Sequence, residues 1–401
     1  MDINNMEIEE KYYRGCITID LDAIYENIEN LKKNLKVGTK ITAVVKSDGY
    51  GHGAIPIVKA VDELVDAYAV ATIDEAINLR ENGVDKPIYV IGFTHKSQIK
   101  RAILGDVRIT VFDYETALAA EEEAEKLNKN ALIHIKVDTG MSRIGFKDND
   151  ESIEIIKKIN ALNNVVIEGI FTHFATADET DKKKTFNQFN RFVSFTDKLK
   201  ENGVNIPIRH CANSAAMMEI QEADLDNVRA GIAMYGLYPS EEVDKNSVKL
   251  KPALGLISHI IFIKDIEKGT EVSYGGTFVA DRKMRIATIP LGYGDGYRRS
   301  LSNKGYVLIN GKKARILGRI CMDQFMVDVS DIDANEGDTV ILIGRSGDEE
   351  LSVEKMAEMA GDTFNYEIVC DLGKRIPRVF FRKGKIVCTK DYFNDRYSVD
   401  I

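Results

Sequence analysis

Short apolar segments rich in β-branched residues alternate with amphipathic stretches over residues 41 to 234. The apolar segments predict buried strands, and the stretches between them show the three-to-four-residue spacing of helices. Two of these helices are predicted over 74–83 and 114–127, and the first should end at Gly83 because glycine favours the position after a helix. The predicted strands cover 41–45, 67–71, 87–92, 108–113, 132–137, 166–171, 206–211 and 228–234.

Eight strands that alternate with helices predict an α/β fold with a parallel sheet and crossover connections. Eight is also the number of strands that closes a (β/α)8 TIM-like barrel, which is the architecture we expect for residues 15–240. An open, doubly wound parallel sheet is the alternative that the pattern leaves open.

The pattern changes after a polar stretch at 238–252, which is typical of a linker. Beyond it the alternation is that of strands, and Asn310–Gly311 between two apolar runs predicts a tight hairpin. Only 352–361 shows helical spacing, so we predict a mainly antiparallel β C-terminal domain over 250–388. An early strand at 16–21 precedes the eight and is a candidate to pair with this second domain.

Composition excludes several classes of protein. The chain has 401 residues, a net charge of −9 and no basic stripe, which argues against nucleic acid or an anionic membrane surface as the main partner. The amino terminus is too polar for a secretory signal, and no apolar run reaches the roughly 18 residues that span a bilayer. The five cysteines are scattered without ligand-like spacing, which argues against disulfides and metal sites and predicts a cytoplasmic protein.

Several polar residues stand at the ends of predicted strands that would share one rim in a barrel, where active sites lie. Lys46 follows the first strand and precedes a glycine-rich turn, "SDGYGHG". His173 follows the sixth strand, Ser214 follows the seventh, and Arg229 begins the eighth. We therefore expect these side chains to meet in one pocket.

A lysine in a desolvated pocket loses its proton readily and attacks carbonyl groups to form a Schiff base. For Lys46 this leaves two chemistries open, an aldolase-type reaction on a sugar or the binding of pyridoxal 5′-phosphate. Both need a phosphate site. Tyr50, the glycine turn, Ser214 and the backbone near Gly231 can form one, because exposed N–H groups bind anions.

Longer blocks of sequence then narrow the choice. They include "AVVKSDGYGHGA" (43–54), "KVDTGMSRIGF" (136–146), "THFATAD" (172–178), "VRAGIAMYGLYP" (228–239), "VSYGGTF" (272–278), "LGYGDGY" (291–297) and "GRICMDQFMVDV" (318–329). These blocks, in this order, resemble the alanine racemase family from about residue 15 to residue 382. The resemblance implies a fold type III barrel that binds pyridoxal phosphate, followed by a β domain, in agreement with the pattern above.

The resemblance implies a racemase that interconverts L-alanine and D-alanine with two bases, one on each face of the substrate Cα. Lys46 would carry pyridoxal 5′-phosphate as a Schiff base and handle the D-alanine proton, and Tyr274 would handle the L-alanine proton. Arg229 would face the pyridine nitrogen without protonating it, since arginine does not release its proton, and His173 would support Arg229. In this family the product D-alanine usually supplies peptidoglycan.

The resemblance also assigns residues to the cofactor, the substrate and a dimer. Arg143 would contact the cofactor's ring phenolate and the substrate carboxylate, and Lys136 aligns with a lysine that is carbamylated in many members. Met322 would meet the substrate carboxylate through its backbone, and Tyr293 would line the entrance. A head-to-tail homodimer is implied, in which Tyr274 and Met322 of one chain complete the pocket of the other. The residues assigned to the cofactor phosphate are Tyr50, Ser214, Gly231 and Ile232.

The chain departs from the family pattern at a few positions. Lys374 stands where many members have a tyrosine that donates to the cofactor phosphate, so phosphate binding would be altered but not lost. Gly294 and the block "KSDGYG" stand where alanine-bearing versions are common, and smaller residues there could relax substrate choice. Serine, or another amino acid such as lysine, is therefore the alternative substrate.

Two further alternatives come from other functional classes. A related barrel decarboxylase would also use a lysine Schiff base, but it gives no reason for Tyr274 or for an arginine at the pyridine nitrogen. A non-catalytic cofactor-binding protein would resemble the barrel alone, whereas this chain keeps a full second domain. The role of His52 is open, and the residues assigned to architecture are His134, His210 and Asp323.

Overall fold

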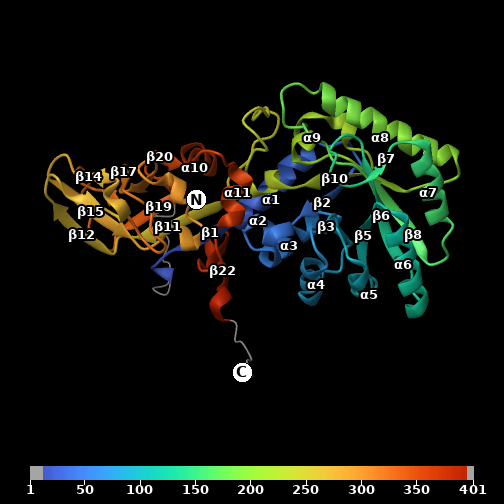
Figure 1. Ribbon diagram of the computed structural model, residues 1–401, viewed down its shortest axis with the longest axis horizontal. Helices are drawn as coiled ribbons and strands as arrows, with labels where there is room; N and C mark the ends of the chain where they lie inside the picture. Colours follow the sequence, from blue (N-terminus) through green and yellow to red (C-terminus); the bar gives the residue numbers. More distant parts are fainter. Residues whose placement is uncertain (1–11, 395–401) are drawn as a thin grey trace. The chain divides into compact units, whose positions relative to one another are not determined.

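The computed structural model describes residues 12–394 of the chain (Figure 1). Within this range the chain divides into two compact units. The barrel unit comprises Ala23–Gly49 and Ala54–Pro252, and the sheet unit comprises residues 12–22, 50–53 and 253–394. Among the described residues, no helix combines the length and the apolar character that crossing a membrane requires.

The barrel unit contains eight parallel strands in the order β10-β2-β3-β4-β5-β6-β8-β9, with the short strand β7 (Phe146–Lys147) paired to β6. The two ends of this order also meet, because the N–H of Arg229 donates to the carbonyl of Ala212 at 3.1 Å. The predicted (β/α)8 barrel is thereby confirmed, and the open sheet is wrong. The strands are β2 (Lys40–Val44), β3 (Ala67–Val70), β4 (Ile88–Val90), β5 (Val107–Val111), β6 (Ala131–Asp138), β8 (Val165–Phe171), β9 (Ile208–His210) and β10 (Asn227–Ala230).

Polar residues cap the N–H groups that are left free where helices begin. Thr72 and Glu75 form a capping box at the start of α4, and Asp113 accepts the N–H of Thr116 at 2.7 Å at the start of α6. Helices α4 and α6 confirm the two predicted helices. Gly83, two residues after the end of α4, has a φ of 79°, which glycine adopts freely. The helices are α1 (Leu21–Lys33), α2 (Lys46–Tyr50), α3 (Ala54–Val61), α4 (Ile73–Glu81), α5 (Ile99–Leu104), α6 (Tyr114–Leu127), α7 (Asp150–Asn160), α8 (Lys183–Glu201) and α9 (Ser214–Glu219).

The eighth strand is shorter than the sequence predicts. Strand β10 ends at Ala230, and Ile232–Tyr235 forms a 3-10 turn where the prediction continued the strand to residue 234. All four residues of this turn are buried. The apolar run therefore reflects burial and not an extended backbone, two cases that periodicity alone does not distinguish.

The sheet unit is built on one mainly antiparallel sheet in the order β12-β15-β18-β17-β16-β19-β11-β1-β21-β22, with β20 paired to β19. Strand β1 (Cys16–Asp20) pairs antiparallel with β11 and parallel with β21. Asn310 and Gly311, with φ angles of 48° and 75°, confirm the predicted hairpin between β16 and β17. The other strands are β11 (Leu254–His259), β12 (Phe262–Ile266), β13 (Glu271–Val272), β14 (Phe278–Val279), β15 (Met284–Ile289), β16 (Tyr306–Ile309), β17 (Lys312–Leu317), β18 (Phe325–Asp328), β19 (Thr339–Ser346), β20 (Glu349–Leu351), β21 (Arg378–Arg382) and β22 (Lys385–Lys390).

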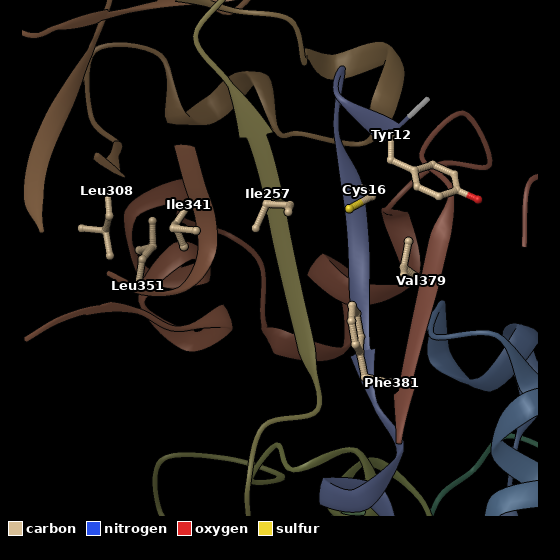
Figure 2. Close-up of a cluster of buried hydrophobic side chains, with 8 residues drawn as sticks. All are labelled: Tyr12, Cys16, Ile257, Leu308, Ile341, Leu351, Val379 and Phe381. Carbon is tan, nitrogen blue, oxygen red and sulfur yellow. The ribbon is translucent and has the colours of Figure 1, made fainter. Parts of the chain in front are cut away.

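A cluster of buried side chains spans the sheet unit from β16 to β21 and includes Cys16 of β1 (Figure 2). Cys16 on β1 lies between Ile257 of β11 and Val379 of β21. Burying one large aliphatic or aromatic side chain contributes about 1.5–3 kcal/mol, so this cluster ties β1 firmly to strands from the far end of the sequence. Its members are Tyr12, Cys16, Ile257, Leu308, Ile341, Leu351, Val379 and Phe381.

The sheet unit contains more helix than the sequence predicts. Helix α10 (Val353–Ala360) matches the helix expected at 352–361, but α11 (Asn365–Asp371) has no counterpart in the prediction. The expectation of a single helix in this part of the chain is therefore wrong. Helix α11 has only seven residues, and Phe364 before it offers no capping side chain, so the usual start signal is missing.

Candidate active site

Lys46 lies two residues after β2 and begins a left-handed turn. Ser47, Asp48 and Gly49 have φ angles of 55°, 50° and 64°, a conformation that costs roughly 1–2 kcal/mol for each residue that is not glycine. The Asp48 carboxylate stabilises the turn by accepting the N–H of Ala54 at 2.8 Å. Backbone strain of this kind clusters at functional sites. The turn fixes the backbone from which the Lys46 side chain projects.

The glycines after Tyr50 are required by close approach of the backbone within the sheet unit. A Cβ atom at Gly51 would lie 2.1 Å from the carbonyl oxygen of Val369, and one at Gly53 would lie 2.6 Å from the ring of Phe380. Tyr50 itself is buried at the start of this segment. The glycines of the turn thus have a packing role that is separate from any contact with a phosphate.

The buried guanidinium of Arg229 is held by acceptors from neighbouring strand ends. Nη1 donates to Nδ1 and to the carbonyl oxygen of His210, at 3.0 and 3.1 Å. Nη2 donates to the carbonyl oxygens of Thr172 and Cys211, at 2.9 and 3.0 Å, and lies 3.3 Å from Nδ1 of His173. These acceptors carry no negative charge, so they orient the guanidinium without neutralising it.

Lys136, on β6, is buried with 2% of its surface exposed, and its Nζ donates to the carbonyl oxygen of Val137 at 3.0 Å. Nζ also lies 5.1 Å from the centre of the Phe171 ring. Burial, together with the nearby positive charge of Arg229, lowers the pKa of Lys136 to about 7 against the opposing effect of Asp138. A lysine with such a pKa is partly deprotonated near neutral pH and is therefore nucleophilic.

His173 and Arg143 lie in loops that follow β8 and β6. Burial, together with the charge of Arg229, lowers the pKa of His173 well below its ordinary value, so its ring is neutral and can accept a hydrogen bond from Arg229. Arg143 has an exposed side chain, and its charge helps to lower the pKa of Lys136. The barrel unit therefore brings Lys136, His173 and Arg229 together, with Arg143 within electrostatic range.

Ser214, at the start of α9, accepts two N–H groups from the segment that follows β10. Its Oγ lies 3.0 Å from the backbone nitrogen of Gly231 and 3.3 Å from that of Ala233. Ser214 is buried, as is Ile232 between the two donors. A hydroxyl group and converging N–H groups are the donor set that phosphate oxygens require. These residues therefore fit the phosphate of pyridoxal 5′-phosphate.

Tyr274 and Met322 lie on one open hollow of the sheet unit. Tyr274 is 69% exposed and Met322 is 52% exposed. The turn that presents Tyr274 begins at Ser273, which has a φ of 65° and donates its hydroxyl proton to the carbonyl of Arg319 at 2.5 Å. Two of the predicted site residues are thus brought together on a surface that another molecule can reach. The hollow has a volume of about 470 Å³ and is lined by Ser273, Tyr274, Cys321, Met322, Asp323, Gln324 and Met326.

Tyr293 belongs to a short turn that a buried carboxylate stabilises. Asp295 has no exposed surface, and it accepts from both Nη atoms of Arg14, at 2.9 and 2.7 Å. The N–H of Gly294 donates to the carbonyl of Met322 at 2.9 Å, which joins this turn to the segment that carries Met322. The sheet unit therefore places the half-exposed Tyr293 next to the Met322 segment.

Two departures from the family pattern have definite surroundings in the sheet unit. A Cβ atom at Gly294 would lie 2.5 Å from Nη1 of Arg375 and 3.0 Å from the carbonyl oxygen of Met322. Protein atoms fill the space that the glycine leaves, which argues against a wider pocket at this position. Lys374 is exposed, and its Nζ lies 5.7 Å from the ring centre of Tyr392.

His210 is more than the architectural residue that the sequence suggests, because it binds Arg229 with both its ring and its carbonyl. His134 in turn lies 2.9 Å from the other ring nitrogen of His210. One signal for His210 is present in the sequence, since it ends a predicted strand at the same rim as His173. Asp323, also assigned to architecture, pairs with Arg375 at 2.7 Å and lines the hollow that contains Tyr274.

Comparisons with known proteins agree with the division into a barrel unit and a sheet unit. Residues 19–239 match the family model of the alanine racemase N-terminal domain, and residues 253–380 match that of the C-terminal domain. An alanine racemase from Clostridium tetani is 47% identical over 377 residues, which cover 93% of this chain and 97% of that protein.

Solved structures of racemases have a similar fold. An alanine racemase from Clostridium difficile is similar with a TM-score of 0.90 and 41% identity, covering 94% of this chain and 98% of that one. A histidine racemase from Leuconostoc mesenteroides is similar with a TM-score of 0.83 and 27% identity, covering 92% of this chain and 99% of that one. On the family models and the identity to curated relatives, this chain belongs to the alanine racemase family.

Proposed function

We propose that this chain is a pyridoxal-phosphate-dependent racemase that interconverts L-alanine and D-alanine. The observation that carries the proposal is the placement of Lys46 and Arg229 on neighbouring strands of the barrel. Strand β10 pairs with β2 so that Arg229 lies opposite Thr42, and Lys46 follows β2 at the same end of the barrel. The family membership supports the same chemistry.

The cofactor would supply the electron sink for negative charge at the substrate Cα when it is bound. Lys46 would hold its aldehyde end, at the left-handed turn that fixes the lysine backbone. Arg229 does not release its proton, so it would donate a hydrogen bond to the pyridine nitrogen without protonating it. This limits the sink and favours return of the proton to Cα. The residues that would hold the phosphate are Tyr50, Ser214, Gly231, Ile232 and Lys374.

Two bases are needed because the proton must leave Cα from one face and return on the other. Lys46 Nζ would exchange the proton on the D-alanine face, and Tyr274 Oη would exchange it on the L-alanine face. His173 would support Arg229 by accepting a hydrogen bond from its Nη2. The groups that would bind the substrate carboxylate or line its entrance are Arg143, the Met322 backbone and Tyr293.

We further propose a head-to-tail homodimer with shared active sites. Tyr274 and Met322 are exposed in a single chain, which is expected of residues that complete the pocket of a second copy. Residues 15–240 would then be the cofactor-binding domain, and residues 250–388 would supply the second base to the partner. The cytoplasmic location expected from the cysteine pattern stays a prediction.

Exchange of the Cα hydrogen in heavy water tests the reaction. The purified protein is given L-alanine, L-serine, L-lysine and L-histidine in parallel, and the products are analysed for deuterium and for chirality. We expect fast exchange with D-alanine as product and little from the others. Faster racemisation of serine, lysine or histidine would keep the two bases but change the substrate. No exchange with any of the four amino acids would refute the proposed racemase activity.

Mixing two inactive variants tests the shared site. Lys46→Ala and Tyr274→Phe each remove one base, and each alone should lack activity. If the two bases come from different chains, random mixing after dissociation restores one intact site in each heterodimer, or about a quarter of the wild-type activity. No recovery, in a preparation shown to contain heterodimers, would mean that both bases come from one chain.

Growth of a D-alanine-requiring bacterium tests the role in peptidoglycan supply. Expression of the wild-type chain should remove the need for added D-alanine, and the Lys46→Ala variant is the control that should not. Failure of the wild-type chain, despite racemase activity in extracts of the same cells, would contradict a biosynthetic role.

A further inference from the structure

A chain of hydrogen-bonded side chains runs through the barrel unit from Arg229 to Arg108. Nδ1 of His210 accepts from Arg229 at 3.0 Å, and Nε2 of His210 lies 2.9 Å from Nδ1 of His134. Nε2 of His134 lies 3.3 Å from Oε2 of Glu168. Glu168 also accepts from Nε and Nη2 of Arg108, at 3.0 and 3.2 Å. The five side chains come from five different strands, β10, β9, β6, β8 and β5.

The donors and acceptors of this chain can be arranged in only one direction. A guanidinium has N–H donors and no acceptor, so Nδ1 of His210 must be unprotonated to accept from Arg229. A neutral His210 then carries its proton on Nε2 and donates it to Nδ1 of His134. His134 must in turn carry its proton on Nε2 and donate it to Glu168. Every hydrogen bond from Arg229 onward therefore points towards the Glu168 carboxylate.

Packing holds both imidazole rings in the orientation that this order requires. A Cβ atom at Gly169 would lie 2.5 Å from Nδ1 of His134, so the glycine makes room for the ring. The Tyr89 ring lies 4.4 Å from that of His134, and the Phe171 ring stacks on that of His210 at 4.8 Å. The direction of the hydrogen bonds is therefore decided by where the protons lie, not by rotation of the rings.

A β-bulge aims Glu168 at this chain. In the pairing of β6 with β8, Ile133 lies opposite Ile167 and His134 lies opposite Gly169, so Glu168 is the extra residue. A bulge of this kind redirects a side chain that regular alternation would point elsewhere.

The protonation states of His210, His134 and Glu168 agree with hydrogen bonds that point towards the carboxylate. Burial lowers the pKa of His210 and of His134, so both rings are neutral. Burial alone would raise the pKa of Glu168, but hydrogen bonds from His134 and Arg108 outweigh it and lower that pKa to about 2. Glu168 is therefore a carboxylate acceptor over the whole physiological range.

We propose that Glu168 is a positioning residue which, through His134, keeps Nδ1 of His210 unprotonated and thereby fixes the guanidinium of Arg229. Its importance for catalysis rests on the proposed function, in which Arg229 faces the pyridine nitrogen. The proton order itself does not depend on that function.

The Glu168→Gln variant breaks the order without changing the shape of the side chain. Both carboxylate oxygens accept hydrogen bonds from Arg108, and Oε2 also accepts from His134. The amide of a glutamine has one oxygen, so in either orientation its NH2 group faces at least one donor. With the NH2 group at the Oε2 position, His134 loses its acceptor, and with the NH2 group at the Oε1 position His134 donates to a neutral oxygen in place of a carboxylate. Because the charged acceptor is lost in both orientations, we expect this variant to redistribute the protons on the two histidines.

The matched control is Glu121→Gln. Glu121, on α6, accepts the N–H groups of Asn163 and Asn164, at 3.1 and 2.7 Å, and takes no part in the chain from Arg229 to Arg108. Both variants remove one negative charge from a carboxylate that has hydrogen-bond partners in the barrel unit.

The test is nitrogen NMR of the holoenzyme with 15N-labelled imidazole rings. In the wild-type protein, His134 and His210 should each be protonated on Nε2 alone. A 15N–15N coupling across the hydrogen bond should join Nε2 of His210 to Nδ1 of His134. Glu168→Gln should lose or weaken this coupling and mix the two tautomers, and Glu121→Gln should not. A wild-type His210 protonated on Nδ1, or a Glu168→Gln spectrum like that of the wild type, would overturn the proposal.

A second readout follows the consequence for Arg229. In Glu168→Gln we expect kcat to fall about tenfold with little change in KM, the lower end of what loss of an outer hydrogen bond costs at metal sites. The visible absorption of the bound cofactor should change with it, and Glu121→Gln should alter neither. Altered tautomers with unaltered absorption and kcat would also overturn the positioning role. Because the NMR measurement needs no turnover, failure of the proposed function would appear separately, as an inactive wild type.

Discussion

Carbamylation of Lys136 is the chemical modification for which the structure gives the strongest physical reason. Carbon dioxide reacts with a neutral amine, forming an N–C bond and releasing one proton. Burial is the largest cause that lowers the pKa of Lys136, and it brings this pKa from 10.5 to about 7. We predict that Lys136 forms a carbamate in bicarbonate buffer near neutral pH, and that exposed lysines do not.

The size of the effect follows from the two pKa values. At pH 7.5, about three quarters of an amine with a pKa near 7 is neutral, against about one part in a thousand for a lysine with an ordinary pKa. The reactive fraction is therefore larger by roughly 700-fold. Arg143 is within electrostatic range, so a carbamate would give it an anionic partner and would be stabilised in return.

The assay is 13C NMR of the protein in 13C-bicarbonate, combined with native mass spectrometry for the added mass of one carbon dioxide. We expect one adduct in the wild-type protein, none in Lys136→Met, and a decline in occupancy as the pH falls through about 7. Absence of the adduct at saturating bicarbonate between about pH 7 and 9, with Lys136 titrating as an ordinary lysine, would refute the reasoning.

Four further predictions concern stability and cofactor binding. In buffer free of carbon dioxide, the contribution of Lys136 to the stability of the wild type should rise between about pH 7 and 10.5, since the unfolded state binds the Lys136 proton there and the folded state does not. Urea unfolding should show that Lys136→Met lacks this part of the slope, which reaches about 1.4 kcal/mol per pH unit, and equal slopes would contradict it. Gly169→Ala should lose about 1–3 kcal/mol on thermal unfolding, because the new Cβ would lie 2.5 Å from the His134 ring; unchanged stability would mean that the ring can move. Ser214→Ala should lower the free energy of unfolding by about 1 kcal/mol, as the N–H groups of Gly231 and Ala233 lose their acceptor. It should also weaken pyridoxal-phosphate binding, because the phosphate loses the hydroxyl donor. Equal affinity in a fluorescence titration would separate Ser214 from the phosphate site. Asp295→Asn should lower the free energy of unfolding by about 2 kcal/mol, because its hydrogen bonds to Arg14 become weaker. Asp323→Asn, at a half-exposed ion pair, should lower it by about 0–1 kcal/mol. Similar losses in the two variants would mean that burial does not set the difference.

The regular parts of the barrel could be predicted from the sequence because each strand is a short β-branched run between amphipathic helices. Helix α6 has the predicted bounds, since Asp113 provides a clear start and the helical spacing continues to Leu127. The apolar run that ends at residue 234 misleads, because a buried 3-10 turn and a buried strand have the same hydrophobicity. Helix α11 is missed because it is short and begins without a capping side chain.

Some residues of the candidate site could be predicted from the sequence pattern and others could not. Lys46, His173 and Ser214 could be singled out because each follows a predicted strand. Arg229 begins the predicted strand 228–234, and it lies near the end of β10 because that strand stops at Ala230. Glu168 could not be, because the bulge that aims it at His134 leaves no mark in the alternation of "VVIEGIF". The exposed position of Tyr274 also had no signal in the pattern, and its role rests on the family resemblance.

The position of β1 has a consequence for the order in which the chain folds during synthesis. The segment Ala54–Pro252 of the barrel unit is continuous in sequence and leaves the ribosome before most of the sheet unit. Strand β1 is made among the first residues, yet Ile19 needs Phe380 as its parallel partner. At about 5–20 residues per second, β1 waits on the order of half a minute for that strand. During this time Ile17 and Ile19, both fully buried in the folded protein, lack the packing partners that later strands provide. Nascent chains are therefore most exposed to chaperones and to mispairing of strands at their earliest segment.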